Sequence, residues 1–251
     1  MIWDWSYTVE IFPTLLDAMW VALAATVVAY SISLILGLFI TLAGRSSFKP
    51  LIWLTLGFIS FIRSTPPLVQ LFFAFFALPQ LGISLSAFAT GVIVLGIHYS
   101  TYVSEIYRSG IEAIPKGQWE ASKALNFSQA YTWRKIILPQ AIPPVIPMLG
   151  NYLIVMFKET PMLSAITVVE MLQTAKIIGS ENFSYLEPIT IVGALFLLLS
   201  YSSSILIRKL ENRMKYAHGN SKPVKSKNDT VMANVVSTIK HALSIRKTER
   251  V

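Results

Sequence analysis

The chain has 251 residues, of which 54% are hydrophobic and 14% charged, and its mean hydropathy is +0.58. So few charges exclude an ordinary soluble domain. Long apolar stretches predict membrane-spanning helices, because a span needs about 20 apolar residues and its backbone groups must be paired within the helix. The lack of cysteine excludes disulfides and thiolate sites, and three scattered histidines, at positions 98, 218 and 241, do not suggest a metal site.

The formal net charge of +8 is unevenly distributed. Residues 212–251 hold nine Lys/Arg and two Asp/Glu, whereas the other 211 residues balance to +1. We expect residues 212–251 to form a flexible, basic cytoplasmic tail near anionic lipid. Nucleic-acid binding is not favoured, because no aromatic or motif pattern accompanies the charge.

Five apolar segments predict an all-α integral membrane protein. They cover residues 14–43, 51–78, 87–106, 144–171 and 188–207. The second is interrupted by Arg63-Ser-Thr-Pro-Pro67, and its crossing is expected to begin near Pro66, because proline is tolerated in a first helical turn. Residues 1–13 would then be an extracytoplasmic N-terminus and residues 14–211 the transmembrane domain. No internal repeat is visible, and the long first segment, preceded by acidic residues, does not resemble a cleavable signal.

The distribution of charge between the segments predicts the orientation. Basic residues gather after segments one, three and five: Arg45, Lys49, Arg108, Lys116, Lys123, Arg134, Lys135, Arg208 and Lys209. The opposite side carries Asp4, Glu10, Glu170, Glu181 and Glu187, with Lys176 as the main exception. Because cytoplasmic loops are enriched in Lys and Arg, the N-terminus should lie outside and the C-terminus in the cytoplasm.

Residues 110–142, on the cytoplasmic side, are expected to form two short helices. The first covers residues 118–125 and has a face of small side chains, at Ala121, Ser122 and Ala124. Asn126 follows where a left-handed backbone would end this helix. Ser128 can cap the second helix, and Leu138-Pro139 is expected to end it.

This region carries a resemblance to a known family. Glu120-Ala-Ser-Lys-Ala-Leu-Asn126, followed by Ile136-Ile-Leu-Pro-Gln140, resembles the EAA loop of permease subunits of ABC importers. Four further segments are similar to the histidine/glutamine-type polar amino-acid permeases: Arg63–Gln70, Ser100–Arg108, Pro115–Gln118 and Lys158–Leu163. The resemblance covers residues 14–212, and residues 2–5 and 13–16 resemble the ectoine/hydroxyectoine branch. The chain departs from the family pattern at Ser64, Ser122, Asn126 and Pro161, and Pro161 leaves the substrate assignment open.

The resemblance implies a permease subunit rather than an enzyme, without a cofactor. It implies an ATPase subunit docked through the EAA loop, a second permease subunit, identical or a sister, and an extracytoplasmic solute-binding protein. The docking residues would be Glu120, Ala121, Ser122, Ala124, Asn126, Leu138 and Pro139. No phosphate-binding Gly-x-x-x-x-Gly-Lys-Ser/Thr motif is present, so ATP would bind to another chain. The solute would be a polar amino acid or a similar zwitterion, with ectoine or hydroxyectoine as a narrower candidate.

Ionisable residues within a span are costly and suggest function. Lys158 and Glu159, with Thr160, would supply a cation and an anion to a zwitterion; the alternative is a Lys158–carboxylate pair that holds helices together. His98 and Tyr99 lie mid-span, where packing is the simpler role. The other candidates are Ser64 and Thr65 for an anionic solute group, and Arg63, Glu105 and Arg108 for an ion pair or gate. Gly91 and Gly96 are expected to permit close helix packing.

Other functional classes fit the sequence less well. A secondary transporter driven by an ion gradient would be expected to show an inverted repeat. A non-transport membrane scaffold gives no role to an exposed EAA-like loop or to charges within the spans. An intramembrane enzyme would need a nucleophile–base or metal constellation, and none is visible.

Overall fold

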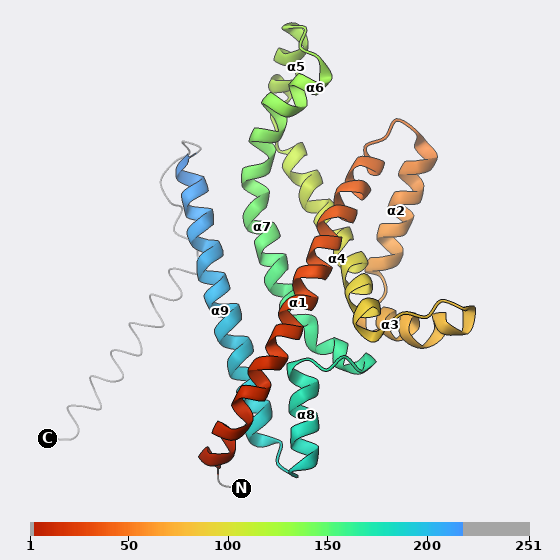
Figure 1. Cartoon of the computed structure of the whole chain (residues 1–251). Coiled ribbons are helices and arrows are strands. Elements are labelled where there is room, and N and C mark those ends of the chain that lie inside the picture. Colours follow the sequence, from red (N-terminus) through yellow and green to blue (C-terminus); the bar gives the residue numbers. More distant parts are fainter. Residues whose placement is uncertain (1–2, 218–251) are drawn as a thin grey trace, which may run out of the picture. The chain divides into compact units, whose positions relative to one another are not determined.

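The computed structural model describes residues 3–217, and all but the last three belong to one structural unit, residues 1–214. Every regular element in this described part is helical, as the sequence predicted (Figure 1). The α-helices are α1 (Trp5–Gly44), α2 (Lys49–Arg63), α3 (Pro67–Phe72), α4 (Ala87–Glu112), α5 (Lys116–Ala124), α6 (Gln129–Tyr131), α7 (Leu138–Glu159), α8 (Met171–Glu181) and α9 (Leu186–Ala217). Two π-helical turns, η1 (Phe73–Ala77) and η3 (Thr132–Ile137), and two 3-10 turns, η2 (Leu78–Leu81) and η4 (Thr160–Ile166), complete them.

Four helical stretches in the described part are long and apolar enough to cross a membrane: residues 5–44, 87–112, 129–166 and 186–213. They correspond to four of the five predicted segments. The remaining one, the second predicted segment (residues 51–78), is a bent pair of helices, residues 49–63 and 67–81, which meet at 99°. The predicted interruption at residues 63–67 is present and a new helix, α3, begins at Pro67, whereas the start of the crossing itself stays a prediction. Pro67 forces the preceding residue, Pro66, into an extended backbone (ψ 138°), so α3 takes a new direction after α2.

Small side chains let α1 and α4 lie close together along the centre of the unit (Figure 1). The buried face of α1 includes Ala25, Ala29 and Gly37. A side chain at Gly96 of α4 would meet Ile32 and the backbone of Ala29, and one at Gly37 would meet Val103. The predicted packing role of Gly96 is confirmed, as is that of Gly91, whose Cβ would meet Leu163.

The prediction that Leu138-Pro139 ends a helix was wrong. The chain is helical from Gln129 through Ile166, and Pro139 lies in the first turn of α7. The π-helical turn η3 immediately before it changes the hydrogen-bond register, and a first helical turn tolerates the missing N–H of proline. At the other end of α7, the α-helix gives way to the 3-10 turn η4, whose second residue is Pro161.

The side that the charge distribution predicts to be extracytoplasmic contains α8 and the N-terminal ends of α1 and α9. Both oxygens of the fully buried Glu170 accept backbone N–H bonds at the start of α8, from Leu172 (3.0 Å) and Gln173 (2.9 Å). Asp4 caps α1, and its own N–H donates to Glu187 at the start of α9 (3.2 Å). The predicted basic tail is helical as far as Ala217, and its residues 218–251 lie outside the described residues.

Candidate functional site

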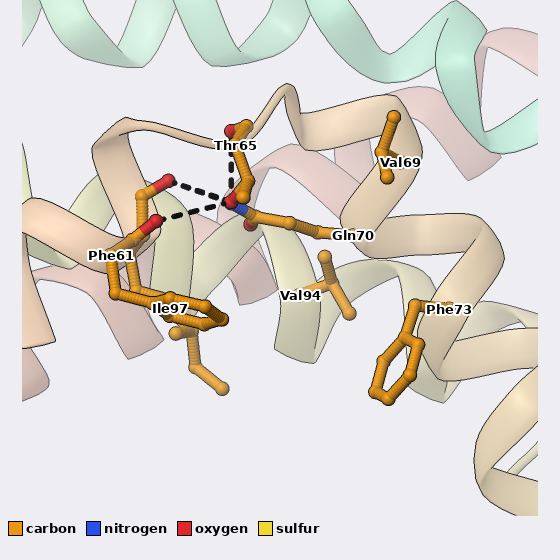
Figure 2. Close-up of a pocket in the computed structure, with 8 residues that line it drawn as sticks. Phe61, Thr65, Val69, Gln70, Phe73, Val94 and Ile97 are labelled. Atoms are coloured by element: carbon orange, nitrogen blue, oxygen red, sulfur yellow. Dashed lines mark hydrogen bonds between the residues drawn. The ribbon is translucent and has the colours of Figure 1, made fainter.

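The bend between α2 and α3 is held by the side chain of Gln70. Its amide nitrogen donates to the Ile62 carbonyl (2.7 Å) and to the hydroxyl (2.6 Å) and carbonyl (3.1 Å) of Thr65 (Figure 2). Thr65 is thus engaged within the bend. The neighbouring Ser64, which the sequence paired with Thr65, is exposed.

An apolar pocket of about 350 Å³ opens beside this bend. Its walls come from α2, α3, η1 and α4, and are formed by Phe61, Ile62, Thr65, Val69, Gln70, Phe73, Val94 and Ile97 (Figure 2). The amide of Gln70 is satisfied by the bonds of the bend. The walls therefore offer little polar recognition, and the pocket is a poor match for a zwitterion.

His98 connects α4 to this bend. It is 6% exposed, its Nδ1 lies 3.2 Å from Gln70 Oε1, and its ring packs against Tyr99 and Tyr102 at centroid distances of 5.5 Å. These contacts give His98 a buried hydrogen-bond partner and a packed ring. They favour the packing role that the sequence left open over direct contact with a solute.

Arg63 is the last residue of α2, and its side chain contacts α4. Its guanidinium donates to the hydroxyl and carbonyl of Thr101 and lies 4.6 Å from the ring centroid of Tyr102. Tyr102 in turn stacks on Tyr152 of α7 (5.7 Å, 30°). The guanidinium of Arg63 therefore links α2 to α4. This contact is consistent with the gating or structural role that the sequence suggested for it.

Tyr99, Tyr102, Tyr152 and Glu159 line one seam between α4 and α7. Tyr152 and Glu159 are seven residues apart, so they share a face of α7. The hydroxyl of Tyr99 faces Glu159, and Tyr99 and Tyr152 meet edge to face at 6.1 Å. Glu159 Oε2 is buried without a hydrogen-bond partner among the described residues. An unpaired carboxylate oxygen in such a seam is a candidate acceptor for a cationic group.

Lys158 and Thr160 are separated from this seam. The side chain of Lys158 is exposed on the single chain, whereas Thr160 is fully buried and its hydroxyl donates to the Phe157 carbonyl (2.8 Å). No carboxylate pairs with Lys158 within residues 3–217. An exposed ammonium so far along a span is costly in lipid. This face of α7 is therefore expected to meet water or another subunit.

At the other end of α4, Arg108 pairs with two carboxylates. Its guanidinium contacts Glu105 and, at 3.0 Å, Glu112. All three side chains are about half exposed. The expected ion pair of Glu105 and Arg108 is present and lies along one helix face, as i,i+3 and i,i+4 pairs do.

The segment predicted to dock an ATPase projects from the ends of α4 and η3 (Figure 1). Two details of the prediction are confirmed: Asn126 is left-handed (φ 53°), and the Ser128 hydroxyl caps α6 by accepting from the N–H of Tyr131 (3.3 Å). Glu120, Ala121 and Ala124 are exposed. Ser122 is only 2% exposed and donates to the Gln118 carbonyl (2.7 Å), so it faces inward. Leu138 and Pro139 are exposed at the start of α7.

Sequence reasoning missed several residues that the fold brings together. Gln70, Tyr152, Trp119 and Trp133 each join two elements that are separate in the sequence. For Tyr152 the available signal was its seven-residue spacing from Glu159. No local pattern marked Gln70, because its partners depend on the bend. Within the described residues, no cluster of His, Cys, Asp and Glu fits a metal ion.

Comparisons with known proteins agree with this arrangement. Residues 33–216 match the family described as "Binding-protein-dependent transport system inner membrane component". The chain is 43% identical over 203 residues to the probable amino-acid ABC transporter permease protein y4tG of Sinorhizobium fredii, covering 81% of this chain and 88% of that protein. It is 34% identical over 213 residues to the arginine transport system permease protein ArtQ of Bacillus subtilis, covering 84% and 97%.

Solved structures of ABC transporters also resemble this chain. A chain from the "Crystal structure of an amino acid ABC transporter with histidines" aligns with a TM-score of 0.80 and 38% identity, covering 85% of this chain and all of that chain. A chain of the MetNI methionine ABC transporter in an inward-facing conformation aligns at 0.68 and 20% identity, covering 82% and 98%, and supports the fold alone. This chain therefore belongs to the family of inner-membrane components of binding-protein-dependent transport systems, and it is a permease subunit of an ABC transporter, a transport component rather than an enzyme.

Proposed function

We propose that the chain forms part of the membrane pathway of an ATP-driven importer for a polar amino acid or a similar zwitterion. The observation that carries this proposal is the exposed helix α5, which projects with α6 beyond the spans within a chain that matches the permease family over residues 33–216. The names of the relatives support an amino-acid solute. Ectoine or hydroxyectoine is the narrower candidate from the resemblance of residues 2–5 and 13–16.

The pathway is proposed to run along the α4–α7 seam. Glu159, with one unpaired carboxylate oxygen opposite Tyr99, would accept the ammonium of the solute. Lys158 and the backbone near Thr160 would act on its carboxylate from the exposed face of α7. Thr65 and His98 would shape the surroundings through the α2–α3 bend, where the exposed Ser64 also lies, and Tyr99 would do so within the seam itself. Arg63 would set the contact between α2 and α4 that opens and closes, and the Glu105–Arg108 pair would stabilise the adjacent end of α4.

A second permease chain, identical or a sister, would cover the exposed face of α7 in the bilayer. The burial of Lys158 against such a partner, or against an aqueous path between the two chains, would avoid the cost of an ammonium in lipid. An ATPase subunit would bind at Glu120, Ala121, Ala124 and Asn126. Inward-facing Ser122 would support that helix, and Leu138 and Pro139 would flank it. A solute-binding protein would deliver the solute from the other side, and movement of the ATPases would drive alternating access.

The proposal is tested by reconstitution. The chain is co-purified with candidate ATPase and solute-binding proteins from the same organism, inserted into liposomes, and assayed for uptake of labelled arginine, glutamine, histidine and ectoine. Uptake should require ATP and the binding protein and should persist when ion gradients are collapsed. Uptake that follows an ion gradient without ATP would instead identify a secondary transporter, and no uptake of any zwitterion would refute the solute class.

A further inference from the structure

Two tryptophans join the docking helix α5 to η3, the turn that leads into α7. Trp119 of α5 and Trp133 of η3 meet edge to face, with ring centroids 5.3 Å apart and planes at 78°. Both rings are half-buried over the buried side chains of Ile114, Ile137 and Ala141. An edge-to-face pair on an apolar base fixes the relative orientation of the two elements that carry it.

Arg45 extends this contact to the turn between α1 and α2. It is the first residue after α1, and its guanidinium carbon lies 5.7 Å from the centroid of the Trp133 ring. Within residues 3–217 no carboxylate pairs with Arg45. The distance lies within the roughly 6 Å range of a cation–π contact, for which tryptophan is the most favourable ring.

The turn at Arg45 leads directly into α2, whose far end is also fixed. There Arg63 binds Thr101 and Tyr102, and Gln70 holds the bend between α2 and α3. A helix of this length behaves as one rigid element between its two attached ends. A displacement of α5 would therefore have a continuous path of contacts through Trp133 and Arg45 to α2, and through α2 to the bend beside His98.

We propose that Arg45 and Trp133 are positioning residues that couple ATPase movement at α5 to movement of α2 in the membrane. The inference rests on the proposed function, because it needs an ATPase that moves α5. It goes further in assigning transmission to the α1–α2 turn, which lies outside the EAA-like segment. The alternative is that Arg45 and Trp133 only stabilise the fold of the docking segment and transmit no movement.

The experiment measures uptake and ATP hydrolysis together in the reconstituted complex. Arg45→Ala removes the cation, Arg45→Lys retains a charge that can still sit over the ring, and Trp133→Phe retains a smaller ring. Lys49→Ala is the matched control, since Lys49 is an exposed cation four residues away with no ring contact. Unmodified complex that fails to assemble or transport would refute the proposed function itself.

In Arg45→Ala, the amount of solute transported per ATP hydrolysed should fall about two- to fivefold, the scale of one exposed cation–π contact. ATP hydrolysis and the amount of bound ATPase should stay near the unmodified values. Arg45→Lys and Trp133→Phe should retain part of the coupling, and Lys49→Ala all of it. The double variant Arg45→Ala/Trp133→Phe should lose less coupling than the two single losses added together, because both changes remove the same contact. Equal losses of uptake and ATPase binding, or unchanged coupling in Arg45→Ala, would overturn the proposal.

Discussion

Gln70 joins α3 to α4, because its side-chain oxygen lies 3.2 Å from Nδ1 of the buried His98. The amide nitrogen of Gln70 already donates to Ile62 and Thr65, so the oxygen acts as the acceptor and His98 donates from Nδ1. One side chain therefore sets both the bend between α2 and α3 and the position of that bend against α4.

Replacing Gln70 with leucine should destabilise the protein. The change leaves the His98 N–H and the acceptors of the bend without their partner, which is expected to cost about 1–3 kcal/mol. The measurement is the midpoint of thermal unfolding of the purified chain in detergent. Gln80→Leu serves as a control at an exposed position of η2, and equal midpoints for the two variants would show that the Gln70 contacts are unimportant.

Bulk on the exposed face of α5 should prevent ATPase binding. Ala121 is exposed in the middle of this helix, so Ala121→Trp is expected to block a close approach while leaving membrane insertion intact. Co-purification of the ATPase with the tagged chain should fall at least about tenfold, the loss produced by 1.4 kcal/mol of binding free energy. Ala113→Trp, exposed but outside α5, should bind normally. Unreduced binding by the Ala121 variant would exclude this face as the docking surface.

Lys158 and Glu159 should affect transport separately. Lys158→Met should reduce or alter uptake with the complex still assembled and still hydrolysing ATP, because only the exposed face of α7 changes. Glu159→Gln should weaken the selection of solutes that carry an ammonium, because the carboxylate opposite Tyr99 loses its charge. Initial uptake rates over a range of solute concentrations measure both effects. Unmodified rates and preference in both variants would identify the two residues as structural.

Cysteine labelling should decide the orientation of the chain, which has no native cysteine. Ser6→Cys, exposed near the start of α1, should react with an impermeant reagent added from outside the cell. Ser47→Cys, exposed in the α1–α2 turn, should react only in inverted vesicles, because Arg45 and Lys49 beside it predict the cytoplasmic side. The reverse pattern would overturn the proposed topology.

Glu170 should make stability depend on pH. Burial raises the pKa of its carboxyl above 4.5, and the bonds from Leu172 and Gln173 only partly oppose this. Since the folded state then holds its proton more tightly than the unfolded state, stability should fall as the pH rises from 4.5 through the folded pKa. Thermal unfolding of Glu170→Gln should lack this slope. The pH dependence at Asp4, the exposed cap of α1, has the opposite sign. Hydrogen bonds from Ser6 and Tyr7 lower the pKa of its carboxyl, so the stability that Asp4 contributes is lost as the pH falls.

The amino-acid sequence by itself determined the elements that depend on local chemistry. Apolar length predicted the spans, the small residues at Gly91 and Gly96 predicted close packing, and Asn126 and Ser128 predicted the end of one helix and the start of the next. The EAA-like pattern also predicted the family, because its two blocks, residues 120–126 and 136–140, are close in the sequence and their spacing is read directly. These properties require only neighbours along the chain.

The tertiary structure decided which side chains meet. The 99° bend at Pro66 brings Gln70 to His98, and the seam of α4 and α7 separates Lys158 from Glu159 by turning them to different surroundings. Leu138-Pro139 failed as a stop signal because the π-helical turn before it changed the hydrogen-bond register. Arg45, Trp119 and Trp133 come from three separate elements. Such contacts follow from helix direction and packing, which local propensity does not specify, and so they required the fold.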